Sequence, residues 1–195
     1  MTSPPRQKRS LRPIDAARLD ELALAYVARF AASAAKLESY LKRKLRERGW
    51  AGEGEPDVNE LVARLVRAGY IDDAAYARAK AGTMRRRGLG ERRVDQALNA
   101  AGVAADHREE VRAGESEQRR AALVFAKRRR LGPFGAVDFT GLDRAAREKQ
   151  LAAVLRAGHR LDHARAVIQA RDSSAAQSWA EEYDADDAAE DLGCA

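Results

Sequence analysis

The chain has few of the residues that build covalent frameworks or membrane spans. Its 195 residues include one cysteine, Cys194, so no disulfide can form within the chain, which is typical of a reducing compartment. No apolar run approaches the roughly 20 residues that cross a bilayer. The basic N-terminus lacks the apolar segment that would follow it in a secretory signal. We therefore expect a cytoplasmic protein that does not contact a membrane.

Aromatic residues are also scarce, at 6% of the chain, whereas alanine is abundant. Helices rich in alanine, leucine, arginine and glutamate form easily, but small side chains bury little apolar surface. No segment alternates apolar and polar residues with β-branched enrichment, so the sequence predicts no sheet. We predict an all-α protein of several small helical units in series, without one thick core.

Charge is plentiful and unevenly distributed. The net charge is +6 and the sequence pI is about 9.7. From Arg171 onward there are one cation and eight carboxylates, a net charge of −7, so residues 1–170 carry +13. A body that basic favours a polyanionic partner, with nucleic acid as the first candidate. A solvated basic face is the alternative that charge alone leaves open.

Local start and stop signals divide the N-terminal part into helices. Ser33 can cap a helix that ends at Gly49. Asp57, after Pro56, can cap the next helix, which ends at Gly69. An earlier amphipathic helix has the apolar face Leu19, Leu22, Tyr26, Val27 and Phe30.

The stretch 69–103 has the most ordered pattern in the chain. Asp72 and Asp73 suit a helix N-terminus, where unpaired N–H groups favour carboxylates. Three arginines, residues 85–87, suit the last turn of that helix, where cations complement exposed carbonyl groups. Gly88 fits a left-handed helix stop. The pattern predicts two short helices joined by a basic corner that glycine breaks.

Glycines also mark an internal repeat. Gly90 lets the chain turn into the second of these helices. Gly49, Gly102 and Gly158 each end the middle helix of a predicted three-helix unit. The successive glycines are 53 and 56 residues apart. An apolar residue stands four positions before each glycine: Leu45, Leu98 and Val154. This sequence pattern occurs three times, which predicts tandem three-helix repeats.

These repeats predict the domain organisation. Each small unit would contact mainly its neighbours, giving an elongated array that can curve and that has no deep catalytic cleft. Trp179 and Tyr183 are aromatic residues in an otherwise small and acidic tail, and two interpretations stay open: docking onto the body or a partner, or a tryptophan exposed by chance. The predicted segments are a flexible basic arm 1–15, three-helix repeats 16–71, 72–115 and 116–171, and an acidic, disordered tail 172–195.

The candidate binding residues are cations that gather at helix ends. A guanidinium group can make two parallel hydrogen bonds to a phosphate. The runs 85–87 and 128–130 end the leading helices of two repeats, and this recurrence favours binding over a merely solvated face. Base-stacking aromatics are not interleaved with the arginines, so we expect contact to the nucleic-acid backbone rather than sequence reading. The candidates are Arg85, Arg86, Arg87, Arg92, Arg93, Lys127, Arg128, Arg129, Arg130, Lys42, Arg43 and Lys44.

No set of catalytic residues is complete. His159 and His163 are four residues apart and would share a helix face, but the glutamate and third ligand of a zinc protease motif are missing. The turn 88–90 does not end in the Gly-Lys-Ser/Thr of a phosphate-binding loop. Cys194 lies among acidic residues, which disfavours a reactive thiolate. We predict no enzyme, cofactor or metal site; the alternative is a metal-dependent activity at the two histidines.

The stretch 69–103 resembles RecX, the bacterial regulatory protein family of the RecA recombinase. The segment 26–33, followed by Leu37, Leu41 and Leu45, is similar to the family's first repeat. The resemblance is closest over residues 20–115 and weaker in the third repeat. There, His159 follows the helix-ending glycine, where the family usually has an apolar residue.

The resemblance implies an all-α protein of tandem three-helix repeats that binds the RecA–DNA filament in its helical groove. It implies inhibition of strand exchange, ATP hydrolysis and co-protease activity, and so a role in DNA repair, recombination and the SOS response. The implied partners are RecA and DNA, single-stranded and also double-stranded. We expect a monomer.

A helix-turn-helix protein that binds DNA on its own is the second hypothesis. A triple-helical unit with a short basic corner can present a recognition helix to the major groove. The face formed by Arg92, Arg93, Gln96 and Asn99 offers polar side chains for base reading. Tight, sequence-dependent binding of duplex DNA without RecA would favour this alternative.

Overall fold

The computed structural model describes residues 12–136 and 141–190, with side chains described up to residue 182. Among these residues the regular structure is helical, and no sheet is present; an isolated parallel bridge joins Ile14 and Trp50. The predicted all-α fold is therefore confirmed. The chain divides into two compact units, the first ending at Tyr76 and the second beginning at Ala77.

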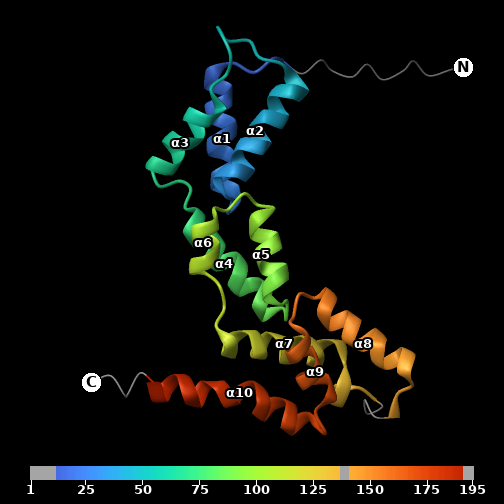
Figure 1. Cartoon of the computed structure of the whole chain (residues 1–195). Coiled ribbons are helices and arrows are strands. Elements are labelled where there is room, and N and C mark those ends of the chain that lie inside the picture. Colours follow the sequence, from blue (N-terminus) through green and yellow to red (C-terminus); the bar gives the residue numbers. More distant parts are fainter. Residues whose placement is uncertain (1–11, 137–140, 191–195) are drawn as a thin grey trace, which may run out of the picture. The chain divides into compact units, whose positions relative to one another are not determined.

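The first unit contains three helices, with α1 beside α2 and α2 packed on α3 (Figure 1). The side chains of Asp15, Ser33 and Asp57 accept hydrogen bonds from backbone N–H groups in the first turns of α1, α2 and α3. Gly49 ends α2, as predicted, with φ 81° and ψ 167°, a conformation that favours glycine. The helices are α1 (Ala16–Arg29), α2 (Ala34–Arg48) and α3 (Val58–Arg67).

Ile14 secures the N-terminal end of this unit. It is fully buried with Leu37 and Leu41 in the core. Its N–H donates to the Gly49 carbonyl at 2.9 Å, and its own carbonyl accepts from Ala51 N–H at 2.9 Å. The prediction of a flexible arm through residue 15 was therefore wrong at its end, while residues 1–11 lie outside the described part.

The two aspartates at the start of α4 (Asp73–Arg86) have different partners. Asp72 accepts from Ala75 N–H at 2.8 Å and caps its own helix, as expected. Asp73 instead accepts from Ala34 N–H at 2.9 Å and so caps α2, 39 residues earlier in the chain. Lys36 adds a 2.7 Å bond to the Tyr76 hydroxyl. The start of α4 is thus held against the start of α2.

The second unit contains the later turns of α4 and two further helix groups. The helix ends at Gly88 and Gly102 share one geometry, in which the glycine has a positive φ. The N–H of the following residue donates to the carbonyl five residues earlier, from Leu89 to Met84 and from Val103 to Leu98. Gly158 ends α8 in the same way, with φ 98°. The elements are α5 (Glu91–Asn99), α6 (Ala105–Glu110), α7 (Glu115–Arg129), a 3-10 turn η1 (Gly132–Phe134), α8 (Arg144–Arg156), α9 (Leu161–Gln169) and α10 (Ser173–Glu190).

The helix α10 corrects the prediction of a disordered tail. It runs along α7 (Figure 1), and Ala176 and Ala180 are fully buried in the core of the second unit. The Trp179 ring meets His163 edge-on at 5.7 Å, and the Arg119 guanidinium lies 5.0 Å from the centre of the Trp179 ring. Of the two interpretations of Trp179, docking onto the body is the one observed. The Tyr183 side chain lies outside the described part, as do residues 191–195, including Cys194.

We predict that Trp179→Ala lowers the free energy of unfolding by about 2 kcal/mol, because it removes a partly buried ring from the α7–α9–α10 core. Thermal or urea unfolding followed by far-UV circular dichroism measures the change. Glu181→Ala, at an exposed position of the same helix, is the control and should change stability by less than about 0.5 kcal/mol. Equal stability of the Trp179 variant and the wild type would contradict the packing of α10.

Candidate partner and nucleic-acid interface

The basic corner after α4 is joined to the turn between α8 and α9. Gly90 N–H donates to the Ala157 carbonyl at 2.9 Å, and Arg92 N–H donates to the Gly158 carbonyl at 3.3 Å. The His159 ring completes the junction, since its Nε2 lies 2.9 Å from the Gly88 carbonyl oxygen. Two segments about 70 residues apart in sequence thus meet through their backbones.

Glycine is required here because the two backbones approach so closely. A Cβ atom on Gly90 would lie 2.3 Å from the Gly158 carbonyl carbon, and one on Gly88 would lie 2.6 Å from Phe125 N. Gly90 itself has φ −79°, which any residue can adopt. The turn conformation predicted for Gly90 therefore does not explain why position 90 is a glycine. The close approach of the Gly158 backbone explains it. Sequence reasoning missed this contact because both partners lie far apart in the chain.

His159 packs as the expected apolar residue would. It is 7% exposed, and its ring lies 5.7 Å from that of Phe125. Burial lowers the pKa of His159, and the bond to the Gly88 carbonyl opposes that shift only in part. The neutral imidazole can donate its Nε2 proton to the carbonyl oxygen, which can only accept. The departure from the family pattern therefore adds a hydrogen bond without losing burial.

His163 belongs to a different cluster. It is 3% exposed, and its Nε2 lies 2.7 Å from the Glu115 carboxylate. Burial raises the pKa of Glu115, but bonds from Arg119 and His163 and the nearby Arg160 outweigh burial and lower it. Within the ranges that the structure describes, no group of three or more possible metal ligands occurs. The two histidines serve separate packing contacts.

Arg85 is occupied by interactions inside the protein. Its side chain is 15% exposed and makes a forked pair with Glu91 at 3.1–3.2 Å. It also donates to the Val111 carbonyl and lies 3.8 Å from Glu117. These contacts tie α4 to α5 and to the end of α6. The geometry therefore disfavours the predicted role of Arg85 as a phosphate ligand.

Arg92 and Arg93 are also used structurally. Arg92 donates to the Leu155 carbonyl at 3.2 Å, and Arg93 Nε donates to the Arg156 carbonyl at 2.9 Å. Both guanidinium groups thus satisfy carbonyls in the last turn of α8, where cations are favoured. A recognition helix would need these side chains for DNA, so the arrangement disfavours the helix-turn-helix alternative.

The remaining predicted cations of the second unit are exposed at two equivalent helix ends. Arg86 and Arg87 end α4, and residues 127–130 end α7. The left-handed residue is Gly88 in the first case and Arg130, with φ 52°, in the second. Residues 85–87 therefore correspond to 127–129, which corrects the predicted match to 128–130 by one position.

The predicted cations of α2 lie in the first unit and are partly neutralised. Lys42 pairs with Glu38, while Arg43 and Lys44 approach Glu47 at 3.7 and 2.6 Å. The hydrogen bond from Lys44 lowers the pKa of Glu47. Exposed pairs of this kind contribute little to stability, so the three cations remain available to a polyanion that displaces the carboxylates.

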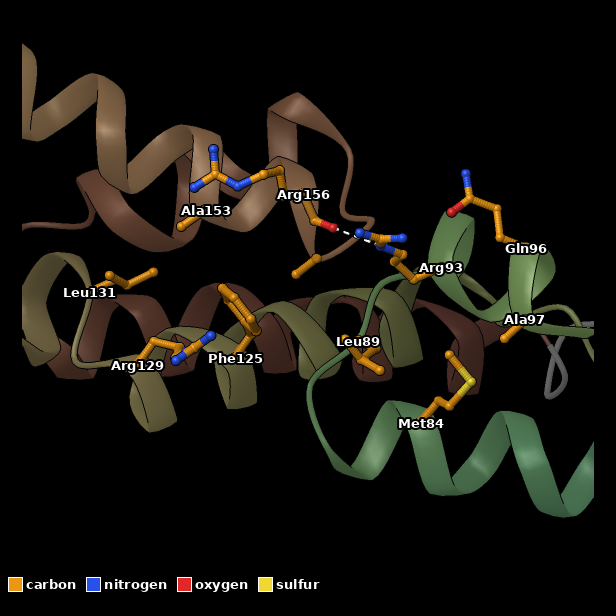
Figure 2. Close-up of a pocket in the computed structure, with 11 residues that line it drawn as sticks. Met84, Leu89, Arg93, Gln96, Ala97, Phe125, Arg129, Leu131, Ala153 and Arg156 are labelled. Atoms are coloured by element: carbon orange, nitrogen blue, oxygen red, sulfur yellow. Dashed lines mark hydrogen bonds between the residues drawn. The ribbon is translucent and has the colours of Figure 1, made fainter. Parts of the chain in front are cut away.

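A groove of about 790 Å³ opens between helices α4, α5, α7 and α8 (Figure 2). Its floor is aliphatic apart from Phe125, and Arg93, Arg129 and Arg156 project from three of its helices. Sequence reasoning missed the groove because its walls come from four separate helices. Its lining residues are Met84, Leu89, Arg93, Gln96, Ala97, Phe125, Arg129, Leu131, Ala153, Arg156 and Ala157.

Across residues 12–136 and 141–190, no helix combines the length and the apolar character needed to span a bilayer.

These features define a class of protein: an all-α protein of tandem three-helix units with exposed cations at equivalent helix ends. The family model described as RecX, second three-helix domain, matches residues 72–111. The Regulatory protein RecX of Myxococcus xanthus is 35% identical over 158 residues, covering 77% of this chain and 83% of the relative. The chain belongs to the RecX family of regulatory proteins, as the resemblance over residues 69–103 predicts.

Two further comparisons extend this result. The Regulatory protein RecX of Deinococcus radiodurans is 39% identical over 111 residues, covering 55% of this chain and 52% of the relative. The crystal structure of RecX from Lactobacillus salivarius superimposes with a TM-score of 0.59 over 78% of this chain and 94% of that chain. At 18% sequence identity, this second likeness demonstrates a shared fold.

We predict that Gly90→Ala lowers the free energy of unfolding by about 2 kcal/mol, because its Cβ would overlap the Gly158 backbone. Gly114→Ala is the matched control: a Cβ there meets nothing within 4 Å, so its stability should stay within about 0.5 kcal/mol of the wild type. Urea unfolding measures both. A Gly90 variant as stable as the Gly114 variant would refute the close approach.

We also predict that His159 makes stability depend on pH. Its pKa is lowered in the folded state, so between the folded value and the unfolded value of about 6.5 the unfolded chain binds more protons. The free energy of unfolding should therefore fall as the pH drops from 7 to 5, by at most about 1.4 kcal/mol per pH unit for this group. His159→Phe should flatten this slope in urea titrations, and His107→Gln is the control for loss of a histidine elsewhere.

Proposed function

We propose that this protein binds the RecA–DNA filament in its helical groove and inhibits strand exchange, ATP hydrolysis and co-protease activity. Membership of a family of regulatory proteins supports the proposal. The observation that carries it is the exposure of cations at two equivalent helix ends, residues 86–87 on α4 and 127–130 on α7. The DNA in a RecA filament is a polyanion inside a regular protein polymer. It therefore suits a protein whose cations recur from one repeat to the next.

The backbone junction between Gly90 and Gly158 supports an inhibitory role. It joins α5, which follows the first cationic end, to α8, which follows the second. The Gly88 backbone also lies against Phe125 of α7, so a partner that engages both ends must accept the spacing that these contacts set. Because a ligand shifts an equilibrium only through different affinities for the two states, inhibition requires tighter binding to one filament form. A rigid pair of contacts supplies such a preference.

The proposed activity is binding, and the chain uses no cofactor for it. Its partners are the RecA recombinase and DNA, single-stranded and also double-stranded, and it acts as a monomer in the cytoplasm. On this proposal the protein acts in DNA repair, recombination and the SOS response. Contact between guanidinium groups and phosphates makes the affinity fall with rising salt.

We predict that Arg86→Glu/Arg87→Glu raises the concentration needed to inhibit RecA ATPase on single-stranded DNA about tenfold, equivalent to about 1.4 kcal/mol of binding. The pair avoids Arg85, whose reversal would place a carboxylate against Glu91 and Glu117. The readouts are ATP hydrolysis and co-sedimentation with the filament, and circular dichroism verifies folding.

The control is Arg144→Glu/Arg171→Glu, which changes the net charge equally at two side chains that are 93% and 86% exposed. It should leave inhibition within about twofold of the wild type. An equal loss in both double variants would assign the effect to net charge alone. Full inhibition by the folded Arg86/Arg87 variant would remove that helix end from the interface. A DNA-only binding assay separates filament binding from stand-alone DNA binding.

A further inference from the structure

The groove of Figure 2 has an aliphatic floor that phosphate contacts leave unused. Leu89, Leu131, Ala97 and Ala153 are each partly exposed on its surface. Covering such surface with an aliphatic side chain contributes about 25 cal/mol for each Å² removed from water. The sugar–phosphate backbone of DNA offers no comparable apolar group. The floor therefore favours an occupant with an aliphatic anchor.

The charge at the groove is of one sign. Three arginines line it, from α5, α7 and α8, and no carboxylate is among the lining residues that the structure describes. Arg129 and Arg156 are exposed and carry the available charge, while Arg93 lies beside them with its Nε bonded to the Arg156 carbonyl. Carboxylates match the guanidinium fork in geometry and charge. The rim therefore favours an acidic occupant.

Nucleobases fit this groove poorly. Single-stranded nucleic acid binds through bases stacked on aromatic faces. The one aromatic residue of the lining, Phe125, is 8% exposed, and the Arg129 guanidinium lies 5.9 Å from the centre of its ring. No open aromatic face is presented within the lining. The combination of aliphatic floor and cationic rim suits a protein segment better than a nucleic acid.

We propose that the groove binds a segment of the filament protein that carries an aliphatic side chain flanked by carboxylates. This inference rests on the proposed function, which supplies the partner. Met84 lies two residues before Arg86, and Arg129 belongs to both the groove and the second cationic helix end. The helix ends thus contact DNA phosphates while the groove between them contacts protein.

A photocross-linking experiment tests this assignment. The full chain carries p-benzoylphenylalanine at Gln96, which is exposed on the groove rim, or at Arg171, which is exposed outside the lining. Each protein is irradiated on RecA filaments assembled on single-stranded DNA, and the products are mapped by mass spectrometry. We expect the Gln96 probe to attach to RecA within a segment rich in Asp and Glu, at a yield at least fivefold above the Arg171 probe.

The outcomes separate the two proposals. In a sample that co-sediments with the filament, three results would overturn the groove assignment alone. These are cross-links mainly to DNA, cross-links to a RecA segment without carboxylates, and equal cross-link yields from both probes. Failure to co-sediment, with DNA-only binding retained, would overturn the proposed function and the groove assignment with it. Absence of any Gln96 cross-link in a co-sedimenting sample also contradicts the assignment.

Two substitutions give a second measurement. Ala153→Leu fills the floor without changing charge, and Arg156→Glu reverses one rim charge while the Arg156 carbonyl bond, a backbone contact, is kept. Each should weaken filament binding at least fivefold and leave affinity for free single-stranded DNA within twofold. Arg171→Glu is the charge control for Arg156→Glu. Equal losses on filament and on free DNA would show that the groove serves nucleic acid instead.

Discussion

The second unit depends on one close approach of two backbones. The turn at Gly88–Gly90 and the turn at Gly158 share hydrogen bonds at distances that leave no room for side chains. This contact fixes α5 against α8 and so forms two walls of the groove. In the same turn, the Gly88 backbone lies against Phe125 of α7, which holds the end of α4 close to that helix. The groove in this unit therefore depends on glycine, the residue with the smallest side chain.

Arginine has two distinct uses in this fold, and the sequence does not distinguish them. Arg85, Arg92 and Arg93 hold helices together through carboxylates and helix-end carbonyls. Arg86 and Arg87, beside them in the chain, are exposed. All of these residues lie in the same basic corner, so local pattern gives them equal weight as ligands. Only the tertiary partners, such as Glu91 and the end of α8, separate structural cations from available ones.

Local signals explain what could be predicted from the sequence. Helix bounds followed from Ser33, Asp57 and the helix-ending glycines, because caps and left-handed stops act within a few residues. The packing of α10 and the groove could not be found in this way. The contacts of α10 use Ala176 and Ala180, whose small side chains give a weak periodic pattern, and the groove assembles from four helices.

The carboxylate of Asp73 has a consequence for where this chain can be divided. It belongs to α4, the first helix of the repeat matched by the RecX second-domain model, yet it caps α2 of the preceding repeat. A fragment cut at the repeat boundary would lose this acceptor and leave Ala34 N–H without it. The first unit is therefore complete only when it extends through Tyr76, so sequence repeats and compact structural units have different borders in this protein.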